Sequence, residues 1–191
     1  MKNIFLATLI LTVSCSSVSE RVITRMDDLS EKPKWASISK VMFADKGKVF
    51  SVGYSEGLAD NRVSALSRIA DNNARLEISR NILNETGFIF QNIEEGINEG
   101  GQFSRFYGNE LSKSITHGVR QERRYWEKVK TFDESGDVIF KVRVYSLISI
   151  EEKDLRKAIK MSLTKKKEIS PKMREAIDNH ITSQIKSLKE Q

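Results

Sequence analysis

The chain has 191 residues, a formal net charge of +6 and 39% hydrophobic residues. This length fits one domain with flanking segments, and 30% charged residues are typical of a soluble globular part. The single cysteine, Cys15, excludes an internal disulfide.

The first seventeen residues, MKNIFLATLILTVSCSS, have the order of an export signal: a lysine, an apolar run from Ile4 to Leu11, and small residues. The run is too short to cross a bilayer as a helix, which takes ~20 apolar residues. The segment resembles a bacterial lipoprotein signal that is cut before a lipidated cysteine, although Thr12 stands where leucine is usual. We predict a signal peptide over residues 1–14 and lipidation of Cys15. An ordinary secretory peptide is the alternative.

The next segment, residues 15–34, is expected to be a largely disordered tether, because its serines, mixed charges and Pro33 offer little to pack. Trp35 is the first large apolar side chain after the signal, and we expect it to cover the edge of the core. The globular domain is predicted over residues 35–163.

A strand over Lys48–Tyr54, ended by Gly53 and Gly57, is expected to lead into a long helix over Asn61–Asn84. The apolar stripe of this helix is Leu66, Ala70, Ala74, Ile78 and Ile82, widened by Val63, Ile69 and Leu83. The small residues Ala70 and Ala74 would let the helix lie close to a sheet. Gly87 is expected just past the end of the helix.

The stretch Phe88–Gly108 is rich in glycines and aromatic residues, which predicts a loop. A long strand is expected over Leu111–Thr131, followed by a tight turn at Asp133–Asp137 and a second strand over Val138–Ile150. Together they predict a β-hairpin.

Two helices are predicted to end the chain. Ser149–Glu152 has the spacing of a capping box before the first helix, and Pro171 suits the first position of the second. Residues 164–191 are expected to form a basic amphipathic helix, since Lys153–Gln191 holds eleven basic and five acidic residues. We expect it to pack on its own domain, because no Trp or Phe marks its apolar stripe for membrane insertion; a membrane surface or another chain is the alternative. The predicted fold class is α+β: a small antiparallel sheet (strand-helix-strand-strand) packed by one long helix, with two C-terminal helices.

No catalytic constellation is visible. His117 and His180 lack metal-ligand neighbours, so no metal site is expected. The carboxylate pairs Glu94–Glu95 and Glu151–Glu152 are adjacent in the chain, so each pair points to different sides. No serine stands in a Gly-x-Ser-x-Gly elbow, and no phosphate-loop pattern suggests a nucleotide. We expect neither a cofactor nor an enzymatic activity.

Four landmarks in order, Lys34–Trp35, Phe50–Tyr54, Ala65–Ile82 and Val138–Leu147, resemble the twenty-kilodalton outer-membrane lipoprotein family typified by the Helicobacter surface antigen. The resemblance covers Trp35 to Leu163. It implies a small α+β domain attached by lipid to the outer membrane, and some relatives serve in the outer-membrane ring of the flagellar motor. It carries over no catalytic residues, and only Cys15 transfers as a functional residue.

The expected function is that of a non-enzymatic, lipid-anchored outer-membrane protein. Its expected partners are envelope proteins, including copies of itself, in envelope or flagellar assembly. Nucleic acid is not an expected partner, because an exported protein seldom meets it. The alternative is an unlipidated secreted periplasmic module that binds a glycan or small ligand through residues 88–108.

Overall fold

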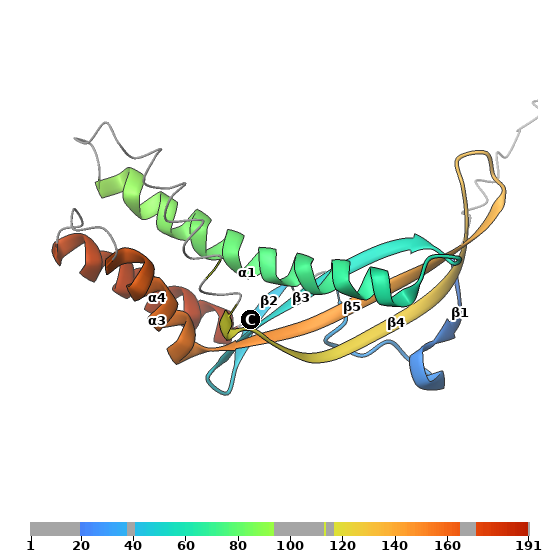
Figure 1. Cartoon of the computed structure of the whole chain (residues 1–191), viewed down its shortest axis with the longest axis horizontal. Helices are drawn as coiled ribbons and strands as arrows, with labels where there is room; N and C mark the ends of the chain where they lie inside the picture. Colours follow the sequence, from blue (N-terminus) through green and yellow to red (C-terminus); the bar gives the residue numbers. More distant parts are fainter. Residues whose placement is uncertain (1–19, 38–40, 94–112, 114–116, 165–170, 191) are drawn as a thin grey trace, which may run out of the picture.

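The computed structural model describes residues 20–37, 41–93, 113, 117–164 and 171–190. Its centre is an antiparallel sheet with a long helix along one face and two helices at one end (Figure 1). The elements are β1 (Arg21–Arg25), the 3-10 turn η1 (Met26–Asp28), β2 (Met42–Asp45), β3 (Lys48–Leu58), α1 (Val63–Ile93), β4 (Arg120–Phe132), β5 (Val138–Glu151), α3 (Glu152–Thr164) and α4 (Pro171–Lys189). The predicted α+β class with C-terminal helices is confirmed.

The sheet has five strands in the order β1-β4-β5-β3-β2, and every neighbouring pair is antiparallel. The predicted hairpin is present as β4 and β5, with its turn held by Asp133, whose carboxylate accepts the backbone N–H groups of Ser135 and Asp137. β4 begins at Arg120, later than the expected Leu111, because Lys113, His117 and Gly118 are helical; residues 111–112 and 114–116 lie outside the described chain. β5 is the middle strand of the sheet, and it pairs with β3 along the whole length of β3.

Helix α1 lies very close to β3, as the small residues of its stripe predict. Gly53 lies at the midpoint of the strand and not at its end. Glycine is required there because a Cβ would stand 1.9 Å from the carbonyl oxygen of Ala70 and 2.5 Å from the backbone nitrogen of Ala74. The stripe itself is buried from Leu66 to Ile78. Ile69 is the exception: it is 49% exposed, so the apolar face is narrower than predicted.

The same helix is longer than expected. α1 continues through Gly87 to Ile93, so Phe88–Ile93 is helical and the expected loop cannot begin at Phe88. Gly87 does not end the helix, because α1 continues past it to Ile93. The remainder of the predicted loop, residues 94–108 with the pair Glu94–Glu95, lies outside the described residues.

Both C-terminal helices close the end of the core. Ile181 and Ile185 of α4 are buried in one cluster with Leu155 and Ile159 of α3 and Ile78 of α1. The last helix therefore packs on its own domain, as predicted. The expected capping box does not form, because Ser149 lies within β5 and its hydroxyl donates to Glu122 at 2.6 Å.

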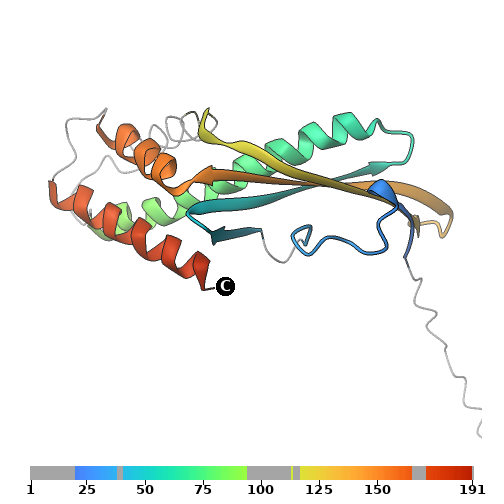
Figure 2. The ribbon, with the colours of Figure 1, turned by 90° about the horizontal axis from the view of Figure 1, so that it is seen from below.

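The segment expected to be a disordered tether is partly folded. Its strand β1 pairs with β4, from Arg21 opposite Lys130 to Arg25 opposite Glu127. This short edge strand has no apolar alternation of its own, and pairing with β4 is what orders it. We call residues 20–36 the strap: β1 is an edge strand beside β4, and the chain from Met26 to Ala36 crosses the face of the sheet opposite α1 (Figure 2).

A second strand, β2, was also missed. It is joined to β3 by Lys46 and Gly47, whose φ angles of 47° and 76° are both positive. Two successive positive φ angles are typical of the tight turn that suits a two-residue hairpin. The glycine was the signal for this turn in the sequence.

Candidate functional site

The predicted lipidation site, Cys15, lies outside the described residues, as do residues 94–108. The first described residue is Glu20, five positions after Cys15. Other chemistry-bearing groups can be placed, and they concentrate on the strap side of the sheet.

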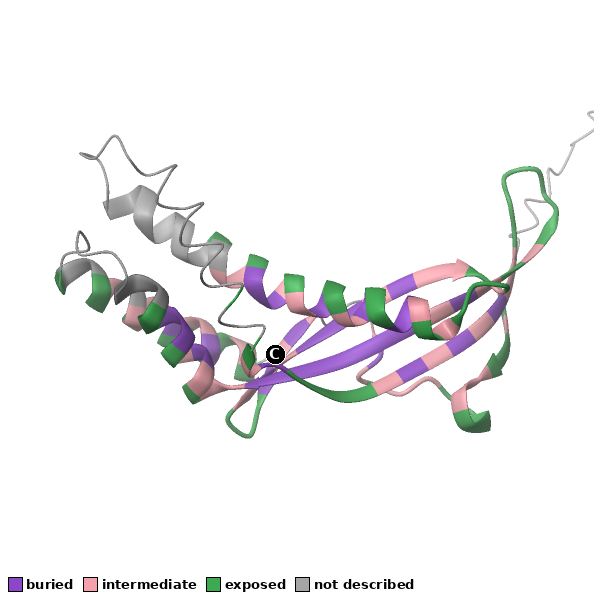
Figure 3. Ribbon diagram, in the orientation of Figure 1, coloured by how far each residue is buried: buried purple, intermediate pink, exposed green. Residues whose placement is uncertain are grey.

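The strap-covered face of the sheet is aromatic. Its buried core is Ala36, Val52, Tyr125, Tyr145 and Leu147, and Met26, Trp35, Phe43, Phe50 and Tyr54 pack against it. Trp35 thus covers the edge of a core cluster, as predicted. Phe43 and Phe50 stack with centroids 4.9 Å apart, and Tyr54 and Tyr145 lie 5.2 Å apart. Figure 3 shows the continuous buried band that β5 forms between this face and α1.

One charged group on this face is Glu56. Its carboxylate accepts hydrogen bonds from the Tyr54 hydroxyl at 2.8 Å, Lys141 Nζ at 2.8 Å and Arg143 Nε at 2.7 Å. Burial raises the pKa of Glu56, but these three donors outweigh burial and bring the pKa to about 2. The other two nitrogens of Arg143 bind the carboxylate of Glu20, which fixes the start of the strap to the centre of the sheet.

A second charged group holds the other end of the strap. Glu127 is only 4% exposed, accepts a hydrogen bond from the Tyr125 hydroxyl at 2.9 Å, and lies 4.0 Å from Lys32 Nζ. Lys32 belongs to the strap, and its ammonium lies 3.8 Å from the centre of the Tyr145 ring. Burial lowers the pKa of Lys32, against the attraction of Glu127.

Glu20, Glu56, Glu127, Lys32 and Arg143 together hold the strap on the sheet, and we call them the charged clamp. Burial raises the pKa of Tyr145 to about 12, and burial together with the bond to Glu127 raises that of Tyr125, so both phenols are neutral at pH 7. The Glu56 carboxylate is ionised at that pH, and three donors already occupy it. The arrangement binds the strap to the sheet and presents no activated base or nucleophile.

Lys141, Arg143 and Tyr145 alternate along β5 and lie on one face of this strand. The sequence did not connect them with Glu56 or Glu20, which are 85 and 123 residues away from their partners. The missing information was the pairing of β3 with β5, which are separated by α1 and β4 in the chain. Alternating polar residues in Tyr54–Glu56 and Lys141–Arg143 were the available signal.

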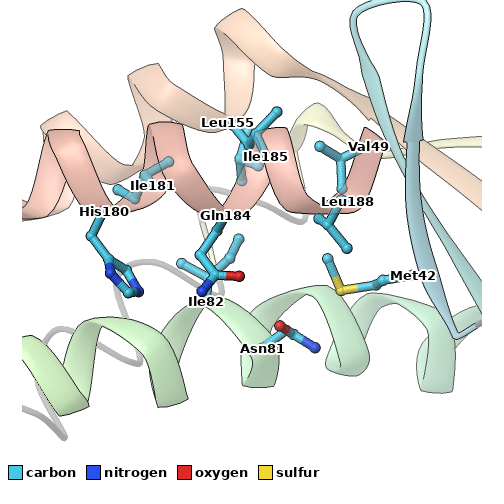
Figure 4. A pocket seen from close by; sticks show the side chains of 10 residues that line it. All are labelled: Met42, Val49, Asn81, Ile82, Leu155, His180, Ile181, Gln184, Ile185 and Leu188. Atoms are coloured by element: carbon cyan, nitrogen blue, oxygen red, sulfur yellow. The ribbon is translucent and has the colours of Figure 1, made fainter. Parts of the chain in front are cut away.

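A small cavity separates α4 from α1 and the β2–β3 hairpin (Figure 4). Its volume is about 30 Å³, and its walls are mostly apolar, including Met42, Ile82, Ile185 and Leu188. Such a space holds about one water, whereas small-molecule sites measure roughly 300–1,000 Å³. The cavity is a packing gap beneath α4.

A wider, open hollow of about 460 Å³ lies where β4 approaches α3. It includes His117 and Asp154, but the ring nitrogen Nδ1 of His117 lies 2.7 Å from the carbonyl oxygen of Lys113. His180 lines the small cavity instead, so the two histidines do not come together. Within the described parts of the chain, no three His, Cys, Asp or Glu side chains are grouped to hold a metal ion.

None of the described helices is both long and apolar enough to cross a bilayer. Among protein-family models, curated proteins and solved structures, none matches this chain.

Proposed function

We propose that the chain is a lipid-anchored lipoprotein of the bacterial outer membrane, without enzymatic activity, that binds other envelope proteins. The observation that carries this proposal is the order of residues 1–17, in which an apolar run leads to small residues and the single cysteine, Cys15. An unpaired cysteine in an exported protein is reactive, and lipidation would cap its sulfur. Ser16, rather than aspartate, after the cysteine suits the outer-membrane sorting rule of enteric bacteria.

The fold supports an anchoring role for the N-terminus. Only four residues separate Cys15 from Glu20, and Glu20 is fixed to Arg143 in the central strand β5. A lipid on Cys15 would therefore hold a sheet, with little free chain between them.

Protein binding is the role that suits this surface. The cavity beneath α4 is too small for a ligand, the wider hollow at His117 and Asp154 is open rather than enclosed, and the charged groups of the strap-covered face are occupied by one another. A partner would meet outer surfaces of the domain, as in a ring or array of envelope proteins. The resemblance to the outer-membrane lipoprotein family is a further reason for the proposal.

The anchor is tested by the mass of the mature chain purified from its native envelope. We expect an N-terminal Cys15 carrying a diacylglyceryl thioether and an amide-linked acyl chain. A Cys15→Ala variant should leave the membrane fraction, and Ser16→Ala is the matched control that should stay. An unlipidated N-terminus, or a Cys15→Ala chain that still partitions with membranes, would contradict the proposal and favour the secreted binding module.

The binding role is tested separately by chemical cross-linking of intact cells. We expect the lipidated chain to be recovered in discrete complexes with envelope proteins or with itself. Recovery as a monomer alone, at cross-linker levels that capture a known envelope complex, would contradict this part of the proposal.

A further inference from the structure

Exposed apolar side chains gather at one end of the sheet. Among the described residues nine large apolar side chains are exposed, and four belong to the β4–β5 hairpin and the end of β3: Leu58 (51%), Phe132 (37%), Val138 (46%) and Phe140 (42%). Phe132 is paired with Val138, and the backbone N–H of Ala59, next to Leu58, donates to the carbonyl of Phe140. Leu58 pairs with Lys141, so its side chain lies on the other face of the sheet from Phe140, and we call Phe132, Val138 and Phe140 the hairpin tip. Single exposed apolar residues are ordinary, but a cluster marks an interaction surface.

Charges around the hairpin tip almost cancel. Lys130 is paired with Phe140 in the sheet, and Lys128 Nζ lies 5.3 Å from the Phe140 ring. The turn itself carries Asp133, Glu134 and Asp137. A partner of this surface would therefore be held by apolar contact rather than by net charge.

The chain enters the fold at the same end. β1 begins at Arg21, opposite Lys130, which is two residues before Phe132 at the end of β4. Figure 1 shows β1 beside the base of the hairpin, and α3 and α4 at the opposite end of the sheet. Five residue steps from Cys15 to Glu20 span at most ~18 Å when fully extended, at ~3.3–3.6 Å per residue.

The short segment between Cys15 and Glu20 limits which surface of the domain can reach the membrane. From Lys130 to Phe132 the strand advances only ~7 Å, at ~3.4 Å per residue, so the hairpin tip lies within reach of a bilayer that holds Cys15. The far end of β3, at Lys48, lies ten residues beyond Leu58, a further ~33 Å along the sheet. The hairpin end is thus the part of the described domain that a short anchor keeps nearest to the lipid.

We infer that the hairpin tip rests on the phospholipid bilayer that holds the lipids of Cys15. Phe132, Val138 and Phe140 enter the boundary between headgroups and acyl chains, and Lys128 and Lys130 extend their ammonium groups to the phosphates. This inference rests on the proposed function, since it needs the lipid on Cys15. Because the charges almost cancel, the contact forms on zwitterionic as well as anionic phospholipid.

The test uses the full lipidated chain in phosphatidylcholine nanodiscs, with a fluorophore on an introduced thiol. With Cys15 capped by lipid, Val138→Cys supplies a single labelling site at the hairpin tip. Met161→Cys on α3, 49% exposed, is the matched control at the other end. We expect a nitroxide-bearing phospholipid to quench the label at position 138 several-fold more than the label at 161, and aqueous iodide to show the reverse order.

Two further measurements separate contact through apolar side chains from attraction by charge. Adding Phe140→Ser to the labelled chain should reduce quenching by lipid at 138, whereas Leu76→Ser, on the exposed side of α1, should leave it unchanged. Anionic lipid or high salt should change the ratio little. Equal quenching at the two positions, in a chain whose mass shows lipid on Cys15, overturns the inference and leaves the proposed function standing.

The remaining outcomes are also decisive. A label at 138 that neither lipid nor iodide reaches is covered by protein, such as a second copy of this chain, and overturns the inference. A chain without lipid on Cys15 overturns the proposed function and this inference together, and the mass measurement on the same sample identifies that case.

Discussion

The two faces of the sheet are covered in different ways. On one face α1 lies against β3 with almost no space, because Gly53 and the alanines of the helix leave room for backbone to meet backbone. On the other face no helix is present among the described residues, and the strap covers tyrosines through ion pairs and hydrogen bonds. The helix-covered face depends mainly on steric fit, with Asp71 of α1 paired to Arg124 of β4, and the strap-covered face depends on satisfied charge beside its aromatic packing.

The two faces are therefore destabilised by different kinds of change. A steric fit is broken by added volume and hardly changes with pH. A charged clamp tolerates changes of shape, but it weakens when a carboxylate is protonated or loses its donor. Variants of single residues on each face test that contrast, and those expected to lose most stability come first.

Gly53→Ala should damage the helix-covered face most. The new methyl would meet the carbonyl oxygen of Ala70 at 1.9 Å, so the whole helix must move, and we expect a loss of about 3 kcal/mol in the free energy of unfolding. Gly57→Ala is the control, since its nearest contact is the side chain of Asn61, which can move aside, and its cost should be about 1 kcal/mol or less. Urea unfolding measures both, and equal costs would show that α1 is not closely seated.

Glu56→Gln should weaken the strap-covered face by roughly 2 kcal/mol at pH 7, since a depressed pKa is a measure of stability and partial exposure reduces it. The pKa of Glu56 is about 2 in the folded chain against an ordinary value of 4.5. Its contribution is therefore complete above about pH 4.5 and is lost as the pH falls towards 2.

The measurement is the unfolding free energy of both proteins between pH 7 and pH 2. The wild-type chain should lose more stability over this range than Glu56→Gln. Part of the decline should remain in the variant, because hydrogen bonds from Ser149 to Glu122 and from Lys189 to Glu152 also lower the pKa of those carboxyls. Parallel curves would show that Glu56 is not part of the clamp.

Tyr125→Phe should cost about 1.5 kcal/mol, because the buried Glu127 carboxylate loses its hydroxyl donor. Tyr54→Phe makes the same chemical change at Glu56, which keeps two cationic donors, and should cost about 0.5 kcal/mol. Thermal unfolding at pH 7 shows which of the two variants loses more stability. The reverse order would mean that Lys32 alone satisfies Glu127.

The smallest effects are expected for serines on the helix-covered face. Ser55→Ala removes a 2.7 Å hydrogen bond to the carbonyl of Leu66 and should cost about 0.5–1 kcal/mol. Ser51 Oγ is buried, and no described group bonds to it, so Ser51→Ala should be neutral or stabilise the chain by a few tenths of a kcal/mol. Calorimetry of the two variants checks whether each one gains or loses stability. A clear loss for Ser51→Ala would reveal a partner for the Ser51 hydroxyl.

The elements that could be predicted from sequence carry their own periodicity. The stripe from Leu66 to Ile78 and the alternation in β5 are repeated often enough to identify a helix and a strand without their partners. β1 and β2 have only five and four residues, and they are ordered by the strands beside them. Their sequences therefore hold little independent signal.

The charged clamp could not be predicted for a related reason. Glu56, Arg143 and Glu20 are ordinary surface residues in the sequence, and only the register between β3 and β5, with the strap laid across it, brings them together. Gly53 was read as a strand end because glycine has that local meaning most often. Its meaning here depends on the helix that crosses it.

The direction of β1 has a mechanical consequence. β1 enters the sheet at the hairpin end, so traction on the N-terminus away from that end acts along the strand axis. The bonds between antiparallel strands are perpendicular to this axis, so the pairs from Arg21–Lys130 to Arg25–Glu127 share the load instead of opening one after another. Arg143 passes part of the force from Glu20 into β5. The first strand is thus arranged to resist shear, and pulling on the N-terminus requires the whole strand to slide.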